Sequence, residues 1–206
     1  GNMKLKFIKP ALNLLMDEWN LGAKESGAPK NLCALIYLFE LIEKSEYFLY
    51  YTENNRLYGF ASYSKKNSKK HIVRKKLASL IRKILLKSKK IKDLAAFEKY
   101  NNSYDYIPDN LKNTFDGEIL ILILDKSLRG KGLGKNLLLE TYKEARKNNI
   151  KNLYILTDDS CTYDIYENTG CKKIFETSIS TTEYGTSKIA TDECAYIYEK
   201  RLDNEN

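Results

Sequence analysis

A glycine-rich turn between a strand-like run and a helix-like run constrains the fold of this chain most. Residues 119–124 are all Ile or Leu, and residues 129–135 follow with Gly130, Gly132 and Gly134 among basic and apolar neighbours. A helical pattern of apolar residues then continues to about position 147. A strand, a glycine-rich turn and a helix in this order direct unpaired backbone N–H groups at one point. The sequence therefore predicts an α/β protein that binds a phosphorylated small molecule.

Three phosphate-binding patterns compete for this turn, and their spacing separates them. A nucleoside-triphosphate P-loop needs G-x-x-x-x-G-K-[ST], but Arg129 stands at the first glycine and Asn136 at the hydroxyl position. A dinucleotide fingerprint needs G-x-G-x-x-G, whereas the glycines here are spaced G-x-G-x-G. The pattern R-x-x-G-x-G, beginning at Arg129, fits, and it resembles the acyl-CoA pyrophosphate loop of the GNAT superfamily of N-acyltransferases. An ordinary glycine-rich turn with solvated charges is the alternative.

A second pattern lies downstream, in the order and at the separation that this family has. Residues 166–171 read Y-E-N-T-G-C and resemble the family signature Y-E-x-x-G-F, with Cys171 in place of the aromatic residue. Gly170 stands where a short helix would end. Asp159 lies seven residues before Tyr166, where the family often has Asn in contact with the arm of the cofactor. The two patterns together favour acetyl-CoA as the co-substrate.

The resemblance implies which residues bind acetyl-CoA. The glycine-rich turn would hold the pyrophosphate, and the backbone of the preceding strand would flank the thioester, with an N–H near Leu124 polarising its carbonyl. The predicted cofactor-binding residues are Leu122, Ile123, Leu124, Arg129, Gly130, Lys131, Gly132, Leu133, Gly134, Lys135, Asp159 and Tyr166.

Two side chains are predicted to carry the proton transfers. An alkylamine with a pKa of about 10.4 must lose a proton before it attacks a thioester. Glu118 resembles the acidic residue that some family members use for this step, and Asp116 is close to it in sequence. Tyr166 is predicted to be the general acid that protonates the departing thiolate. The alternatives are that Glu118 is only a strand-edge carboxylate and that Tyr166 is only a packing residue. Cys161 is not expected to form a covalent intermediate, because no histidine lies near it in sequence and the only histidine, His71, lies in the 65–114 segment.

The predicted elements follow the order of the GNAT fold, a mixed, mostly antiparallel central sheet flanked by helices. Strands are expected near residues 4–8, 46–52, 57–64, 118–124, 152–156, 172–180 and 195–201. Helices are expected near residues 11–21, 31–44, 134–147 and 162–168. We expect one N-acetyltransferase domain over residues 1–206, with a basic helical insertion at 65–114 between the third and fourth strands.

The net charge of +8 comes from one segment, residues 65–92, which holds 13 Lys or Arg and no acidic residue. Its apolar residues recur at helical spacing: Val73, Leu77, Leu80, Ile81, Ile84 and Leu85. We expect a helix that packs this stripe on the domain and leaves its lysines in solvent. A weak contact with a polyanion, such as an anionic membrane or nucleic acid, is the functional alternative.

Composition bounds the remaining expectations. With 43% hydrophobic residues the chain can build a core, and no run of 18 apolar residues is present. The four cysteines show no C-x-x-C spacing, so a metal site is not expected. We expect a cytoplasmic protein whose thiols are reduced. The expected reaction is acetyl transfer to a primary amine of a small molecule or peptide. A homodimer, a non-catalytic acyl-CoA sensor, and a membrane- or nucleic-acid-binding module remain open.

Overall fold

The computed structural model describes residues 1–180 and 192–203, which form a six-stranded sheet in the order β1-β2-β3-β4-β6-β5. The strands are β1 (Tyr47–Glu53), β2 (Arg56–Lys65), β3 (Gly117–Leu124), β4 (Asn152–Asp158), β5 (Lys172–Ser180) and β6 (Asp192–Arg201). Only β3 and β4 pair in parallel, and every other neighbouring pair is antiparallel. The predicted mixed, mostly antiparallel sheet is confirmed.

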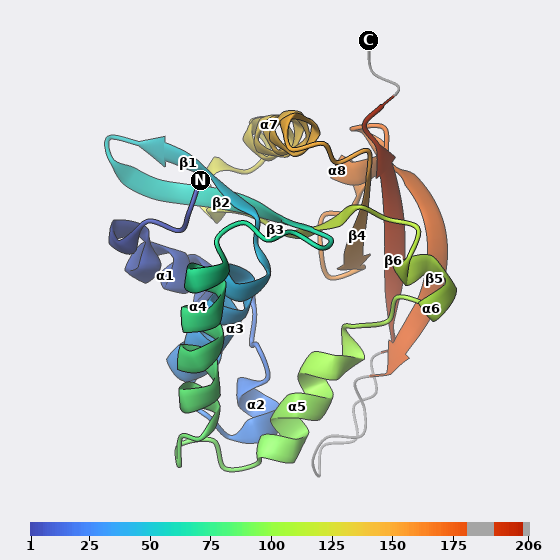
Figure 1. Cartoon of the computed structure of the whole chain (residues 1–206). Helices are drawn as coiled ribbons and strands as arrows, with labels where there is room; N and C mark the ends of the chain where they lie inside the picture. The colour runs from blue at the N-terminus through green and yellow to red at the C-terminus, as the bar shows by residue number, and fades with distance from the viewer. Residues whose placement is uncertain (181–191, 204–206) are drawn as a thin grey trace.

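Helices cover both faces of this sheet (Figure 1). The helical elements are η1 (Leu5–Phe7), α1 (Ile8–Glu18), α2 (Ala23–Ser26), α3 (Lys30–Lys44), α4 (Ile72–Leu86), α5 (Leu94–Ser103), α6 (Asp109–Lys112), η2 (Lys126–Leu128), α7 (Leu133–Lys147) and α8 (Asp164–Glu167). One core lies between the sheet and α1 and α3, and it contains Leu15, Leu38 and Phe60. A second core lies on the α7 side and contains Leu138 and Tyr198.

The strand predicted for residues 4–8 is wrong. These residues form η1 and the start of α1, and Leu5 is 85% exposed whereas Phe7 is buried. The alternation of polar and apolar residues here does not mark a strand, because only the ring of Phe7 is buried. Pro10 does not end the helix, because it lies in the first turn of α1, where no backbone N–H is needed. The helical segment expected between a third and a fourth strand therefore lies between β2 and β3.

The orientation expected for the basic helix is wrong for four of the six residues of its apolar stripe. Val73, Leu77, Leu80 and Ile84 of α4 are all more than half exposed. Ile81 is half-buried and Leu85 packs against the core beside α1 and α3, and the fully buried position of this helix is Ala78. Glu40 and Glu43 of α3 both pair with Arg82 of α4, so the side of α4 that faces α3 carries a basic residue as well as the buried Ala78. Among the described residues, none of the helices is both long enough and apolar enough to cross a bilayer.

Candidate active site

β3 and β4 separate halfway along their length. Their parallel register ends at the pair Ile119–Ile155, although β3 continues to Leu124 and β4 to Asp158. Beyond Ile119 the edge of β3 that faces β4 therefore has no strand partner. Backbone N–H and C=O groups on an unpaired strand edge are available to a ligand.

A β-bulge marks the point of separation. Tyr63 of β2 pairs with Ile119 and the preceding Ser62 pairs with Ile121, so Leu120 is an extra residue in β3. A bulge bends its strand and increases the local twist. It also moves side chains to the other face, since Ile119 packs in the core beside α7 and Ile121 in the core beside α1 and α3. The bulge thus opens the sheet where the two cores meet.

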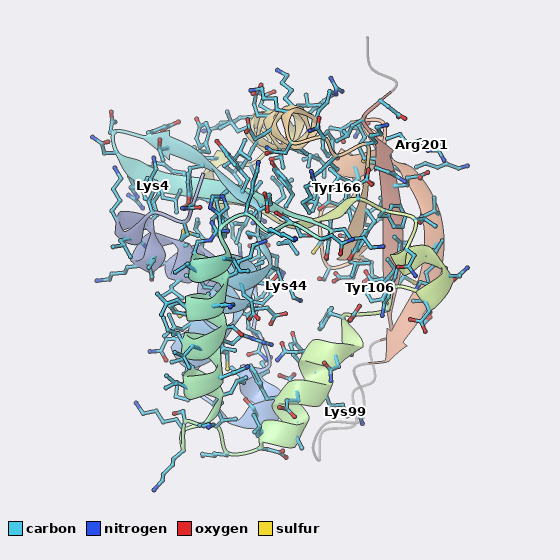
Figure 2. All side chains as sticks on the ribbon, viewed as in Figure 1. Lys4, Lys44, Lys99, Tyr106, Tyr166 and Arg201 are labelled. Atoms are coloured by element: carbon cyan, nitrogen blue, oxygen red, sulfur yellow. The ribbon has the colours of Figure 1, made fainter. Side chains whose placement is uncertain are left out.

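A cavity of about 1030 Å³ occupies this opening. Known small-molecule sites measure roughly 300–1,000 Å³, so the space suits a large cofactor together with a second substrate. Its walls come from distant parts of the chain: α1 and α3, β3 and β4, the glycine-rich loop, α8, and residues 100–107. Lys44, Tyr106 and Tyr166, from three of these segments, surround the same central space (Figure 2).

The glycine-rich loop places free backbone donors at one end of the cavity. Gly132 precedes α7 with φ +74°, a left-handed conformation that glycine adopts without strain. The first hydrogen bond of the helix joins the N–H of Asn136 to the carbonyl of Gly132. The N–H groups of Leu133, Gly134 and Lys135 have no acceptor among the described residues. A Cβ at Gly132 would meet no atom within 4 Å, so the space above the loop is open. Such a helix N-terminus suits a pyrophosphate.

The basic residues of the loop differ in what they contact. Arg129 donates to the carbonyl of Leu124 through Nε and Nη2, both at 3.2 Å, and its Nη2 lies 2.7 Å from Glu18 Oε2. Arg129 therefore braces the loop against the end of β3 and against α1. Lys135 lines the cavity, whereas Lys131 is exposed outside its lining.

Most of the predicted cofactor-binding residues line this one cavity. They are Leu122, Ile123, Leu124, Arg129, Gly130, Gly132, Leu133, Gly134, Lys135 and Tyr166. Asp159 lies outside the lining, because its carboxylate accepts a hydrogen bond of 3.2 Å from the backbone N–H of Cys194. The neighbouring Asp158 lines the cavity instead, and its Oδ1 accepts from the N–H of Ser160 at 2.9 Å. Sequence spacing alone could not distinguish these adjacent carboxylates.

Tyr166 lies where β3 and β4 have separated. It belongs to α8, its ring packs on Tyr198 with 5.6 Å between ring centroids, and its side chain is buried at the cavity wall. Burial raises its pKa, and the nearby Cys161 adds to this shift. The phenol therefore keeps its proton at neutral pH. Its hydroxyl has no hydrogen-bond partner among the described residues, so the proton can be given to a ligand.

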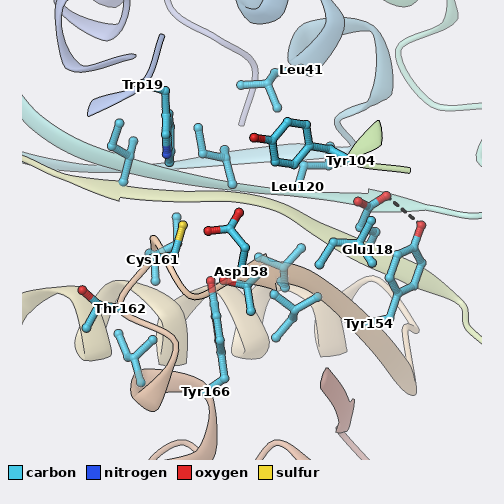
Figure 3. Close-up of a pocket in the computed structure, with 18 of the residues that line it drawn as sticks. Trp19, Leu41, Tyr104, Glu118, Leu120, Tyr154, Asp158, Cys161, Thr162 and Tyr166 are labelled. Atoms are coloured by element: carbon cyan, nitrogen blue, oxygen red, sulfur yellow. Dashed lines mark hydrogen bonds between the residues drawn. The ribbon is translucent and has the colours of Figure 1, made fainter. Parts of the chain in front are cut away.

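Glu118 lies on another side of the cavity, close to the last paired part of β3 and β4 (Figure 3). The Tyr154 hydroxyl donates a hydrogen bond of 2.8 Å to Glu118 Oε2. Burial raises the pKa of Glu118 to about 6, although the Tyr154 hydrogen bond and the charge of Lys44 lower it, and Asp105 and Glu40 raise it further. A carboxylate with this pKa can take a proton near neutral pH.

Sequence reasoning missed the aromatic wall of the cavity. The residues of this wall come from the end of α1, from α3 and from the segment after α5, and they are Trp19, Tyr37, Tyr104 and Tyr106. The Tyr106 hydroxyl donates to the carbonyl of Thr157 at 2.6 Å, which attaches that segment to the separated end of β4. The tyrosine-rich stretch at residues 100–106 was a compositional signal, but the sequence does not say which cavity it faces.

Cys161 also lines the cavity, and Figure 3 shows it on the left of the view, beside Asp158 and Tyr166. Burial and the charge of Asp158 raise the pKa of its thiol to about 11. The thiol is therefore protonated at neutral pH and a weak nucleophile. His71 lies at the start of α4 and is not part of the cavity lining. Among the described residues, no cluster of His, Cys, Asp or Glu is arranged to hold a metal ion.

Comparisons with known proteins report on the fold. No protein-family model matches the chain, and no curated protein sequence does. Arylalkylamine N-acetyltransferase 2 from Aedes aegypti is similar in structure, with 16% identity, 98% of this chain and 97% of that chain covered, and a TM-score of 0.57. Aminoglycoside 6'-acetyltransferase type Ii is 13% identical, with 100% of this chain and 98% of that chain covered and a TM-score of 0.56. A putative acetyltransferase from Salmonella typhimurium, solved with its cofactor acetyl-CoA, is 13% identical, with 96% of this chain and 92% of that chain covered and a TM-score of 0.51.

These solved structures are named as acetyltransferases, and the chain has their fold over nearly its whole length. The fold predicted from the two sequence patterns is confirmed. At these identities the similarity describes the architecture, so the activity has to be argued from the cavity itself.

Proposed function

We propose that this chain is an N-acetyltransferase that transfers the acetyl group of acetyl-CoA to a primary amine by direct attack. One observation carries the proposal: a single cavity joins the free N–H groups of the glycine-rich loop, the unpaired edge of β3, Tyr166 and Glu118. A phosphate-binding end, a polar strand edge, an acid and a base are the parts that this reaction needs.

The loop supports the proposal for the co-substrate. The open space above Gly132 and the unpaired N–H groups of Leu133, Gly134 and Lys135 fit a pyrophosphate. Acetyl-CoA supplies the acetyl group as a thioester. The edge of β3 beyond the bulge would accept its extended arm, and backbone N–H groups there would polarise the thioester carbonyl.

Glu118 is proposed to accept the proton of the incoming ammonium, directly or through water. The carboxylates of Asp105 and Glu118 line the same cavity and would attract a cationic acceptor before it loses its proton. Glu40 also lines the cavity, but it is paired with Lys44 and Arg82. Aromatic walls from Tyr37 and Tyr104 favour a cation that carries an apolar body.

Tyr166 is proposed to donate its proton to the sulfur of the departing coenzyme A. The amine nitrogen forms a bond with the acetyl carbon, the carbon–sulfur bond breaks, and the sulfur receives the Tyr166 proton. The nitrogen then loses its remaining extra proton, which returns through water to the Tyr166 phenolate, and Glu118 releases the first proton to solvent. Burial keeps this phenol protonated until the sulfur carries negative charge. Cys161 takes no part, because its thiol is protonated.

The test combines binding with turnover. Titration calorimetry should show binding of acetyl-CoA and no comparable binding of ATP or NAD. Mass spectrometry of reactions with polyamines, arylalkylamines, aminoglycosides, amino acids and peptides should then identify an acetylated amine. Binding of acetyl-CoA with no acetylated product in any class would indicate a non-catalytic sensor. Binding of ATP or NAD without acetyl-CoA would refute the cofactor assignment.

A further inference from the structure

Helix α4 presents an apolar stripe to solvent. Val73, Leu77, Leu80 and Ile84 are 78%, 56%, 55% and 61% exposed, and they recur every three or four residues along one face. Ile72 at the start of the helix is 52% exposed. With the exceptions of Leu5 and Leu94, the strongly exposed large hydrophobic residues in the described part of the chain all lie on this helix. An apolar patch of this kind on a folded protein indicates a contact surface.

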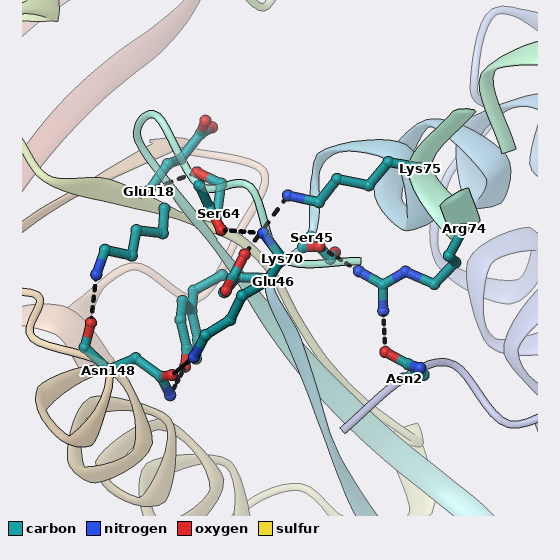
Figure 4. A network of polar contacts seen from close by, with 12 residues as sticks. Asn2, Ser45, Glu46, Ser64, Lys70, Arg74, Lys75, Glu118 and Asn148 are labelled. Atoms are coloured by element: carbon teal, nitrogen blue, oxygen red, sulfur yellow. Dashed lines mark hydrogen bonds and ion pairs between the residues drawn. The ribbon is translucent and has the colours of Figure 1, made fainter. Parts of the chain in front are cut away.

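The helix cannot turn this stripe inward, because its opposite face is anchored to α3. Ala78 is buried against the core, and Arg82 Nη2 lies 3.2 Å from Glu40 Oε2. Lys75 Nζ lies 3.5 Å from Oε2 of Glu46, and the Glu46 side chain is buried. Arg74 Nη2 donates to the carbonyl of Ser45 at 2.5 Å (Figure 4). The basic residues of α4 therefore divide into an inner group that holds the helix and an outer group.

The outer group borders the apolar stripe with positive charge. Lys76 and Lys83 are exposed on α4 and have no ion-pair partner among the described residues, and Lys87 and Lys69 are exposed just beyond its ends. Residues 65–92 contain no acidic side chain. Apolar residues flanked by lysines on one face of a helix are typical of helices that lie in the interface of an anionic bilayer.

We propose that α4 docks this face on a membrane that contains anionic phospholipid. The stripe would enter the boundary between headgroups and acyl chains, and Lys76 and Lys83 would contact the headgroups. A second copy of the chain fits less well, since pairing two such faces would bring lysines together. Nucleic acid offers phosphates but no apolar layer for Leu77 and Leu80. The proposal concerns a surface of α4 that is not part of the cavity lining, and it does not depend on the proposed activity.

Two double variants test the two components of this surface. Leu77→Gln with Leu80→Gln removes apolar area at exposed positions, and Lys76→Glu with Lys83→Glu reverses the rim charge. The matched controls are Leu94→Gln, at a 40% exposed position of α5, and Lys143→Glu with Lys147→Glu on α7, on the other side of the sheet. Circular dichroism spectra and thermal melts establish that each variant folds.

Co-sedimentation with vesicles of phosphatidylcholine containing roughly 30% phosphatidylserine is the measurement, at about 50 mM and about 300 mM salt. We expect binding at low salt, weaker binding at high salt, and weak binding to pure phosphatidylcholine. Each α4 double variant should lose at least about tenfold in affinity, and the controls should keep theirs.

Three outcomes would overturn the proposal. The first is no binding to anionic vesicles at low salt. The second is undiminished vesicle binding by the Leu77→Gln and Leu80→Gln variant, which would mean that charge alone acts. Binding to duplex DNA that is stronger than binding to vesicles, and that this variant retains, would have the same meaning. The third is a dimer in analytical ultracentrifugation that this variant dissociates, without vesicle binding.

Discussion

The Tyr154 hydroxyl donates a hydrogen bond of 2.8 Å to Glu118 Oε2, and these two residues are also register partners in the short paired part of β3 and β4. The side chains therefore meet just before the two strands separate. The hydrogen bond stabilises the carboxylate and lowers its pKa, against burial, which raises that pKa to about 6. The geometry of the sheet thus sets both the position and the protonation of the proposed base.

A pH dependence follows from this pair. Below about pH 6 Glu118 is protonated and cannot accept the proton of the amine, so kcat/KM should rise as the pH increases through this value. Glu118→Gln should remove this acidic limb and lower the rate at neutral pH. Tyr154→Phe removes a hydrogen bond to the ionised form, so the limb should move to higher pH. An acidic limb that is unchanged in Glu118→Gln would assign the base to another group.

The general acid is tested by Tyr166→Phe. Loss of the hydroxyl should lower kcat by roughly 10²–10⁴-fold, with little change in the affinity for acetyl-CoA, because the proton is needed only as sulfur departs. Tyr163→Phe is the matched control, since Tyr163 lies at the start of the same short helix but outside the cavity lining. Equal rates for the wild type and Tyr166→Phe would reduce Tyr166 to a packing residue.

The loop is tested by Gly132→Val. The valine would add a side chain in open space at the loop and would strain a residue whose φ is +74°, and either effect would disturb the proposed pyrophosphate site, so acetyl-CoA binding should fall by at least about tenfold. Gly27→Ala is the control, because Gly27 has a similar positive φ of +62° but lies at the end of α2, outside the cavity lining. Calorimetry that shows equal acetyl-CoA affinity in both variants would contradict the assigned loop function.

Cys161 should be dispensable for the chemistry. Its thiol is protonated at neutral pH, since its pKa is raised to about 11, so Cys161→Ala should keep kcat within about threefold of the wild type. Rapid mixing with labelled acetyl-CoA in the absence of an amine should give no acetylated protein. A labelled peptide containing Cys161 would instead support a covalent route.

The orientation of α4 gives a prediction about stability. Ala78 is buried against α3 and Leu80 is exposed, so Ala78→Glu should destabilise the fold by about 3 kcal/mol. In a chain of this size that corresponds to a decrease of about 6–12 °C in the unfolding temperature. Leu80→Glu should leave the unfolding temperature nearly unchanged. Thermal melts of the two variants measure the difference, and the opposite order would mean that the apolar stripe is buried.

The sequence by itself determined the elements that rest on local chemistry. Asn54 and Asn55 adopt positive φ values of 48° and 61° in the tight turn between β1 and β2, the strands expected near residues 46–52 and 57–64. The glycine-rich turn begins α7 at Leu133. The short helix that carries Tyr166 ends at Glu167, and Gly170, three residues later, adopts the left-handed conformation in the turn that precedes β5. Each of these depends on a few neighbouring residues, which is why a pattern in the chain could reveal it.

Tertiary structure alone decided how these elements meet. The bulge at Leu120 and the separation of β3 from β4 arise from pairing between strands far apart in sequence, and they create the cavity. Asp158 lines the cavity and Asp159 does not, because the Asp159 carboxylate accepts a hydrogen bond from the backbone N–H of Cys194 on the neighbouring strand β6. The direction of α4 was predicted incorrectly for four of its six apolar residues, because apolar periodicity says that a helix has two faces, whereas its packing against α3 decides which face is buried.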